Sequence, residues 1–181
     1  WDSLTAAIAD FRGDKHKSLW FTGHSLGAGL ATIAVARLLD MGHAVDGLYT
    51  FGQPRTGDVR FARDFNRVFK STTFRFVNNN DVVTRIPPRV LGYRHTGTLR
   101  YFDEDGDFHA EIGYWRRLFD RIYGRLADLF HWGTDGIKDH GMEHYMSLVR
   151  AHYLLDMKRL HAAEEAKRMQ IQKELSQMPG V

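Results

Sequence analysis

The sequence contains no cysteine and carries little net charge, and both facts exclude functions. Without cysteine there is no disulfide, no thiolate metal site and no cysteine nucleophile. No apolar stretch approaches the roughly 20 residues that a membrane-spanning helix needs. The formal net charge is only +3, because 25 basic residues are interleaved with 22 acidic ones. Nucleic-acid binding would rest on charge in the C-terminal segment alone, and it is therefore not favoured.

The chain is long enough for one domain with a hydrophobic core. Of its 181 residues, 43% are hydrophobic and 13% aromatic, a composition typical of a globular protein. Glutamate and lysine alternate towards the C-terminus, which predicts a solvated helix there. We therefore assign residues 1–155 to the folded domain and residues 156–181 to a charged C-terminal helix or tail.

Strand-like and helix-like segments alternate along the first half of the chain. Short apolar runs predict buried strands at 18–22, 47–52 and 72–77. Apolar residues at helical spacing predict helices at 1–11, 25–39 and 58–69. Strands and helices in this order predict parallel βαβ units, and hence an α/β fold with helices on the faces of the sheet.

The second half of the chain departs from this alternation. The Asp105-Gly106 pair predicts a turn between two short strands within 95–112. Apolar spacing predicts helices over 115–130 and 144–155. The first of these helices carries a basic stripe, for which a solvated face is favoured over contact with anionic lipid. The stripe consists of Arg117, Arg121 and Arg125.

A serine lies between two glycines where a predicted strand passes into a predicted helix. The segment from Gly23 to Gly27 has the Gly-x-Ser-x-Gly pattern of a nucleophile elbow, a sharp turn that lifts the hydroxyl of Ser25 out of the sheet. The two glycines leave room for a strained backbone and for close strand–helix contact. The N–H of Leu26 would point to the oxyanion that forms on attack. The pattern is also compatible with a structural turn, so the serine needs partners.

A serine nucleophile needs a base within hydrogen-bond reach and a carboxylate that orients this base. Asp81 follows the third predicted strand, where an orienting carboxylate is expected, although residues 78–81 could also form an Asx-type turn. Ten histidines compete for the role of the base. His140 and His144 both follow Asp81 at a loop-to-helix junction, and their chemistry alone does not separate them. His24 is interpreted as structural, because adjacent side chains at a turn diverge.

Two patterns resemble metal sites, but each lacks a required part. Asp103, Asp105 and Asp107 alternate, yet the glycine lies at loop position four, whereas an EF-hand needs it at position six. The pair His140 and His144 lacks the glutamate of a His-Glu-x-x-His zinc site and an obvious third ligand. Neither calcium nor zinc is therefore expected.

Four ordered parts of the chain together resemble one family. They are LWFTGHSLGAGLA at 19–31, YTFGQPRTGD at 49–58, FRFVNNNDVVTRIPP at 74–88 followed by GYRHTG at 92–97, and DHGMEHY at 139–145. In this order they resemble the class 3 lipases, the fungal-lipase-like branch of the α/β-hydrolases. The resemblance implies an α/β-hydrolase-type fold, with a mostly parallel sheet flanked by helices.

The resemblance also implies roles for individual residues. Ser25 would be the nucleophile and Asp81 the acid, and Leu26 would supply one oxyanion N–H. In the family the catalytic histidine directly follows an aspartate, which selects His140 over His144. No metal or organic cofactor is implied.

The sequence departs from the family pattern in three places. Ala28 stands where the family usually has a second glycine, and Val82 stands where it often has proline. Only 24 residues precede Ser25, whereas in these lipases several strands, a loop with the second oxyanion donor and a lid precede the elbow. We therefore expect the C-terminal part of a lipase domain that lacks the N-terminal strands, or a naturally reduced relative.

The expected activity is hydrolysis of lipid carboxylic esters, such as glycerides, through an acyl-enzyme, with transient contact to a lipid surface. The alternative is a non-catalytic remnant of the fold that binds lipid or a partner protein.

Overall fold

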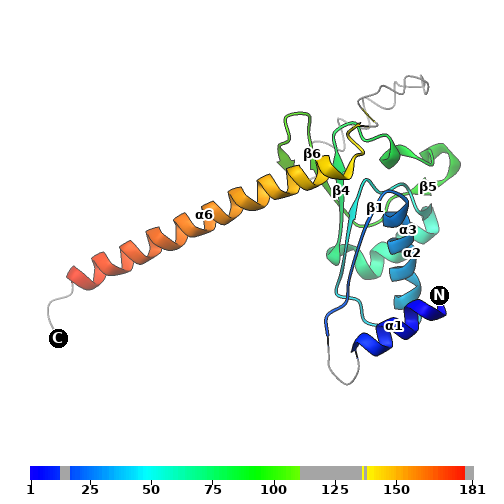
Figure 1. Ribbon diagram of the computed structural model, residues 1–181, viewed down its shortest axis with the longest axis horizontal. Helices are drawn as coiled ribbons and strands as arrows, with labels where there is room; N and C mark the ends of the chain where they lie inside the picture. Colours follow the sequence, from blue (N-terminus) through cyan, green and yellow to red (C-terminus); the bar gives the residue numbers. More distant parts are fainter. Residues whose placement is uncertain (13–16, 111–135, 137, 178–181) are drawn as a thin grey trace.

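A five-stranded sheet forms the centre of the molecule (Figure 1). The computed structural model describes residues 1–12, 17–110, 136 and 138–177. The strands, in the order in which they lie side by side, are β1 (Trp20–His24), β2 (Gly47–Phe51), β4 (Thr73–Asn78), β6 (Thr98–Phe102) and β7 (Phe108–His109). The first four pair in parallel and β7 pairs antiparallel to β6. This confirms the predicted α/β fold with a mostly parallel sheet.

Two helices connect the parallel strands and build the core on one face of the sheet. They are α2 (Leu26–Asp40) and α3 (Val59–Phe69), and α1 (Asp2–Arg12) precedes β1. Val35 and Phe65 from these helices pack with Leu48 of β2 in one buried cluster. The side chain of Asp58 caps α3 by accepting a hydrogen bond from the N–H of Phe61 at 2.8 Å.

The opposite face of the sheet is aromatic and receives the start of the last helix. The ring of Phe76 stacks on Phe51 at 5.0 Å and on Phe102 at 6.1 Å, measured between centroids. From α6 (Met142–Gln177), the ring of Tyr145 meets Phe51, and the ring of His152 meets Phe102. The contact of Tyr145 with Phe51 fixes the first turn of α6 against the strands, which places the residues just before this helix over the sheet.

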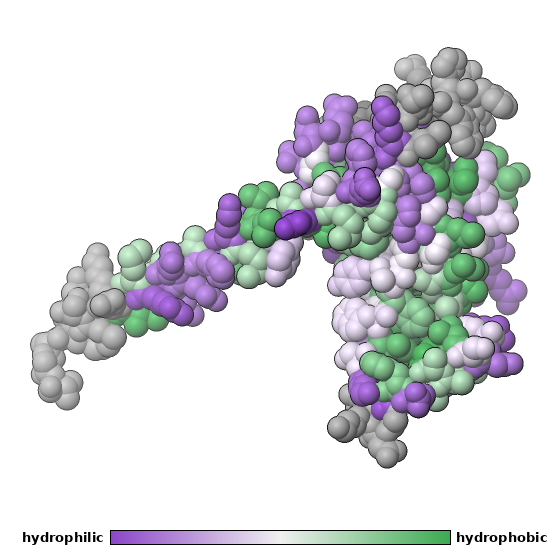
Figure 2. All heavy atoms as spheres, viewed as in Figure 1, coloured by the Kyte–Doolittle hydropathy of each residue, from purple (hydrophilic) through white to green (hydrophobic). Residues whose placement is uncertain are grey.

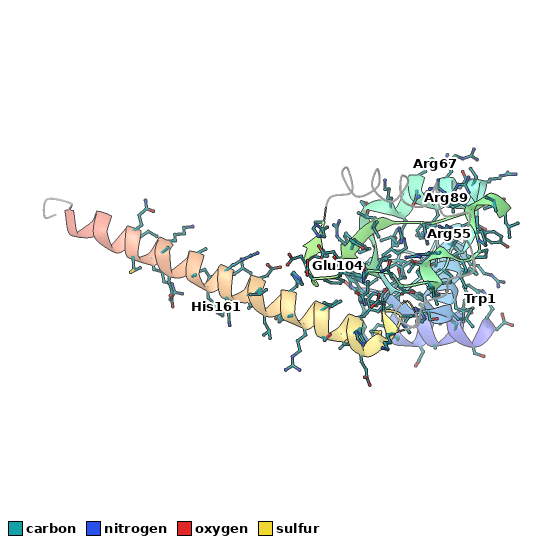
Figure 3. The ribbon with its side chains drawn as sticks, turned by 90° about the horizontal axis from the view of Figure 1, so that it is seen from above. Trp1, Arg55, Arg67, Arg89, Glu104 and His161 are labelled. Atoms are coloured by element: carbon teal, nitrogen blue, oxygen red, sulfur yellow. The ribbon has the colours of Figure 1, made fainter. Side chains whose placement is uncertain are left out.

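Beyond its first turns α6 extends away from the sheet (Figure 1). His161 lies well out along this projecting part (Figure 3). Hydrophobic and hydrophilic side chains are interspersed along its visible face (Figure 2). No helix of the described residues is both long and apolar enough to cross a membrane.

The remaining elements are short. A two-stranded antiparallel ribbon, β3 (Gly57–Asp58) with β5 (Tyr93–Arg94), was not predicted from the sequence. Single 3₁₀ turns lie at Lys70–Thr72, Val83–Arg85 and Arg89–Leu91. The two short strands predicted around the Asp105-Gly106 turn are present as β6 and β7.

The C-terminal part of the chain was predicted to contain several separate helices. The sequence predicted a helix over 144–155 and a separate charged helix or tail over 156–181, whereas α6 is continuous. The proposed domain boundary at residue 155 therefore falls inside α6 and remains a prediction. The predicted helix over 115–130, with Arg117, Arg121 and Arg125, lies outside the described residues.

Candidate active site

Ser25 occupies a strained turn between β1 and α2. Its backbone has φ 56° and ψ −127°, a conformation that a residue with a side chain rarely adopts and that is common at active sites. Its N–H donates to the carbonyl of Phe51 at the end of the neighbouring strand, at 3.0 Å. A Cβ at Gly23 would lie 2.5 Å from the carbonyl oxygen of Gly27, so glycine is required at Gly23 for the close approach of strand and helix. Space around Gly27 itself is open.

Three side chains from distant parts of the chain form a hydrogen-bonded series. The Nε2 of His140 lies 2.8 Å from the Oγ of Ser25. The Nδ1 of the same ring lies 3.0 Å from both carboxylate oxygens of Asp81. A carboxylate accepts hydrogen bonds, so Nδ1 carries a proton and Nε2 is left to accept the proton of the serine hydroxyl. The structure thus brings together the three residues that the sequence singled out.

The carboxylate of Asp81 is fully buried and is met by donors from three directions. The hydroxyl of Tyr145 donates to Oδ2 at 2.6 Å, and the N–H of Val83 donates to Oδ1 at 2.9 Å. Burial, together with the nearby charge of Asp81, raises the pKa of Tyr145 above its ordinary value, so the phenol remains a donor. With His140, these donors stabilise the ionised carboxylate in one orientation.

Hydrogen bonds also tie the loop that carries Asp81 to the loop that carries His140. The side chain of Asn78 donates to the backbone carbonyl of Asp139 at 2.9 Å. The Asp139 carboxylate accepts from the side chain of Asn79 at 3.2 Å and from the N–H of Asn80 at 3.1 Å. The N–H of Asp81 donates to the carbonyl of Asn78 at 2.9 Å, so residues 78–81 form a turn while they also present Asp81 to His140.

Leu26 begins α2, and its side chain is 70% exposed. Its N–H belongs to the first turn of the helix, where backbone donors have no acceptor within the helix. A role for this N–H in an oxyanion hole remains a prediction.

The other histidines weighed against His140 are engaged elsewhere or face solvent. His144 is exposed on α6. His95 places Nε2 2.8 Å from the carbonyl of Thr84, and its burial beside Arg75 lowers its pKa well below the ordinary value. His109 pairs with Asp103 at 2.6 Å. Of these histidines, therefore, only His140 contacts Ser25.

Burial also lowers the pKa of two arginines, Arg55 and Arg75. It lowers the pKa of Arg75 to about 10, and with the charges of Arg89 and Arg94 it lowers the pKa of Arg55 to about 10. Arg55 and Arg89 lie at the same end of the body (Figure 3). Arg55 donates to the carbonyls of Arg85 and Pro87, so it braces the loop that follows Asp81.

The carboxylates of Asp103, Asp105 and Asp107, weighed above as a calcium pattern, lie at a hydrogen-bonded turn. The carboxylate of Asp103 accepts the N–H groups of Asp105 and Asp107, at 3.1 and 2.8 Å, and so closes the turn. Within residues 1–12, 17–110, 136 and 138–177, no group of three or more His, Asp or Glu side chains could hold a metal ion.

The two local departures from the family pattern are accommodated. The methyl group of Ala28 is fully buried in the strand–helix contact. The N–H of Val82 lies 3.4 Å from the carbonyl of Gly136, a contact that proline could not make.

Gly52, which no motif in the sequence singled out, lies directly beside Asp81 and His140. Its φ of +57° is in the left-handed region, where glycine is favoured. A Cβ at this position would lie 2.8 Å from the Oδ2 of Asp81 and 2.8 Å from the Nδ1 of His140. Only glycine therefore lets the two side chains meet at this distance. The one signal in the sequence was a glycine at the end of a predicted strand.

We expect the Gly52→Ala substitution to lower kcat by about 10²-fold, because the added methyl group pushes His140 and Asp81 apart and misplaces the base. Gly42→Ala is the matched control: Gly42 also has a positive φ, +79°, but the space where its Cβ would lie is open. Both substitutions should lower the melting temperature through backbone strain, and only Gly52→Ala should lower kcat in an ester hydrolysis assay. Equal kcat values for the two variants would contradict this prediction.

Comparison with known proteins shows that part of the chain is similar to one family. Residues 2–91 match the family model described as Lipase (class 3). The chain is 44% identical over 82 residues to secreted mono- and diacylglycerol lipase 1 of Fusarium solani, a match that covers 45% of this chain and 24% of that protein. It is 41% identical over 83 residues to a secreted mono- and diacylglycerol lipase of Malassezia restricta, covering 44% of this chain and 27% of that protein.

Solved structures give the same result. The triacylglyceride lipase of Rhizomucor miehei superposes with a TM-score of 0.50 at 30% identity, over 57% of this chain and 40% of that one. A triacylglycerol lipase whose catalytic centre is formed by a serine protease triad superposes with a TM-score of 0.51 at 29% identity, over 59% of this chain and 42% of that one. The chain thus spans about a quarter of the length of these curated relatives and about two fifths of these solved structures. With the matched fold and motifs, these similarities show that residues 2–91 match the class 3 lipase family and that the chain shares the α/β-hydrolase fold of these lipases.

Proposed function

We propose that this protein is a serine hydrolase that cleaves carboxylic esters of lipids through an acyl-enzyme. The observation that carries the proposal is the unbroken hydrogen-bonded series from Ser25 through His140 to Asp81, with distances of 2.8 and 3.0 Å. This series supports catalysis over the alternative of a non-catalytic remnant, because a binding module has no need of an ordered acid, base and nucleophile.

In the first half-reaction the Oγ of Ser25 attacks the ester carbonyl carbon while the Nε2 of His140 takes the hydroxyl proton. The negative charge that develops on the carbonyl oxygen is stabilised by the N–H of Leu26. Asp81 holds the imidazole in the required tautomer and stabilises its positive charge. The intermediate then expels the alcohol, which takes the proton from His140 and leaves an acyl group on Ser25.

In the second half-reaction water replaces the alcohol. His140 removes a proton from water as the water oxygen attacks the acyl carbon. The second tetrahedral intermediate collapses, the carboxylic acid leaves, and the proton returns to Ser25. The cycle involves no change of oxidation state, so it needs no oxidant or reductant.

Glycerides are the proposed substrates. Support comes from the curated relatives, which are mono- and diacylglycerol lipases, and from solved triacylglycerol lipases. We also propose transient contact with a lipid surface, because such substrates are held in lipid aggregates.

The function is tested by covalent labelling and turnover. We expect a fluorophosphonate to attach one group to Ser25, identified by mass spectrometry, and p-nitrophenyl esters of short and long acyl chains to be hydrolysed. Both reactions should be lost in Ser25→Ala. They should persist in Ser147→Ala, which removes an exposed serine of α6. Hydrolysis by Ser25→Ala at the rate of the unmodified chain, or absence of label on Ser25, would refute the proposal.

A further inference from the structure

The side chain of His24 contacts the catalytic histidine, contrary to the expectation that it diverges from the site. Its Nε2 lies 2.7 Å from the backbone carbonyl oxygen of His140. Its ring stacks on the ring of His140, with centroids 4.6 Å apart and planes inclined by 28°. The ring of Tyr145 meets His24 edge-on, with centroids 6.0 Å apart.

The acceptor of this hydrogen bond determines which group of His24 carries the proton. A carbonyl oxygen can only accept, so the Nε2 of His24 carries the proton and donates it. The bond therefore holds the backbone of His140, while the stacked ring restricts rotation of the His140 side chain. Together with Asp81 at Nδ1 and Ser25 at Nε2, His24 leaves His140 one orientation.

The stacked ring also matters electrostatically. During the proposed reaction the ring of His140 gains a proton and becomes positively charged. The face of a Trp, Tyr or Phe ring stabilises a cation within about 6 Å of its centroid, and a neutral imidazole ring has a weaker face of the same kind. The ring of His24, at 4.6 Å, lies where this charge develops.

We propose that His24 is a positioning residue for ester hydrolysis, which holds the backbone of His140 by donation and the imidazole by stacking. The inference rests on the proposed function. It predicts an effect on kcat rather than on substrate binding, because His24 acts on the base and not on the ester.

The experiment separates the two contacts of His24. His24→Gln keeps an N–H donor near the position of Nε2 and removes the ring. His24→Phe keeps the ring and leaves the carbonyl of His140 without its donor. We expect each to lower kcat about tenfold with KM unchanged, and His24→Ala to lower kcat about 100-fold, because it removes both contacts.

His152 provides the matched control within the same chain. Its Nε2 lies 2.9 Å from the carbonyl of Gly106, and its ring packs on Phe102 at 5.5 Å, yet it does not touch the site. His152→Ala should lower the melting temperature and leave kcat unchanged. If His152→Ala lowers kcat as much as His24→Ala does, His24 has only a structural role and the inference is wrong.

A readout that needs no turnover distinguishes this inference from the proposed function. The proton on Nδ1 of His140, shared with Asp81, gives a low-field NMR resonance, which should shift or broaden in His24→Gln and His24→Phe and stay unchanged in His152→Ala. Such a shift in a chain that hydrolyses no ester would refute the function and keep the contact role of His24. Normal hydrolysis with an unchanged resonance in both His24 variants would overturn the inference and keep the function.

Discussion

Replacement of His140 by alanine is expected to lower kcat by about 10⁶-fold, whereas replacement of His144 by alanine should leave it within about twofold of the unmodified chain. His140 is the base in the proposed reaction, and without it the hydroxyl of Ser25 loses the group that accepts its proton at 2.8 Å. The two histidines are four residues apart, but His144 is exposed on α6. Comparison of the two variants therefore tests whether His140 or His144 is the base. The chemistry of the two residues alone did not decide between them.

The measurement is steady-state hydrolysis of a soluble p-nitrophenyl ester, with circular dichroism to show that both variants are folded. Fluorophosphonate labelling of Ser25 should slow in parallel with kcat in His140→Ala. Activity that survives in His140→Ala and is lost in His144→Ala would reverse the assignment of the base.

Replacement of Asp81 by asparagine is expected to lower kcat by about 10⁴-fold without unfolding the protein. The amide is nearly the same size as the carboxylate but replaces one acceptor oxygen by a donor. The carboxylate now receives hydrogen bonds from His140, Tyr145 and Val83. An NH₂ group facing these donors leaves at least one of them unpaired, and it favours the wrong tautomer of His140.

Asp103 supplies the control for this substitution. It forms the second aspartate–histidine pair of the described residues, with His109 at 2.6 Å, at the turn between β6 and β7. Asp103→Asn should leave kcat unchanged while Asp81→Asn lowers it, both measured with the same ester at the same pH. A comparable loss in the two variants would show that the effect is not specific to the proposed acid.

Local patterns were sufficient to predict the sheet, Ser25 and Asp81, whereas the choice of His140 over His144 came from the resemblance to class 3 lipases. The elbow around Ser25 combines a strand, two glycines and a helix within one short segment. Asp81 was found because it follows a predicted strand, at the edge where Ser25 also lies. Each of these signals comes from neighbouring residues, so it can be read from the chain before any tertiary contact is known.

The residues that surround the triad could not be predicted in this way. Gly52, His24 and Tyr145 act through contacts with residues that are 29 to 116 positions away. The rule that adjacent side chains diverge was misleading for His24, because the loop carrying His140 folds back over the end of β1. Asp139 gave a weak signal, since it precedes the histidine, but its bonds to the loop of Asp81 follow only from the fold.

The alignment of β1 with β2 affects the proposed reaction, because the end of β1 contacts His140. The strands pair with Gly23 opposite Thr50 and His24 opposite Phe51, and the N–H of Ser25 donates to Phe51. Consecutive residues at the end of this strand make both links to His140, one through the hydroxyl of Ser25 and one through the ring of His24. Because side chains alternate along a strand, a slip of one residue would break both links at once. In the described sheet β1 is an outer strand, so the rate of the proposed ester hydrolysis would also measure how firmly that strand is docked.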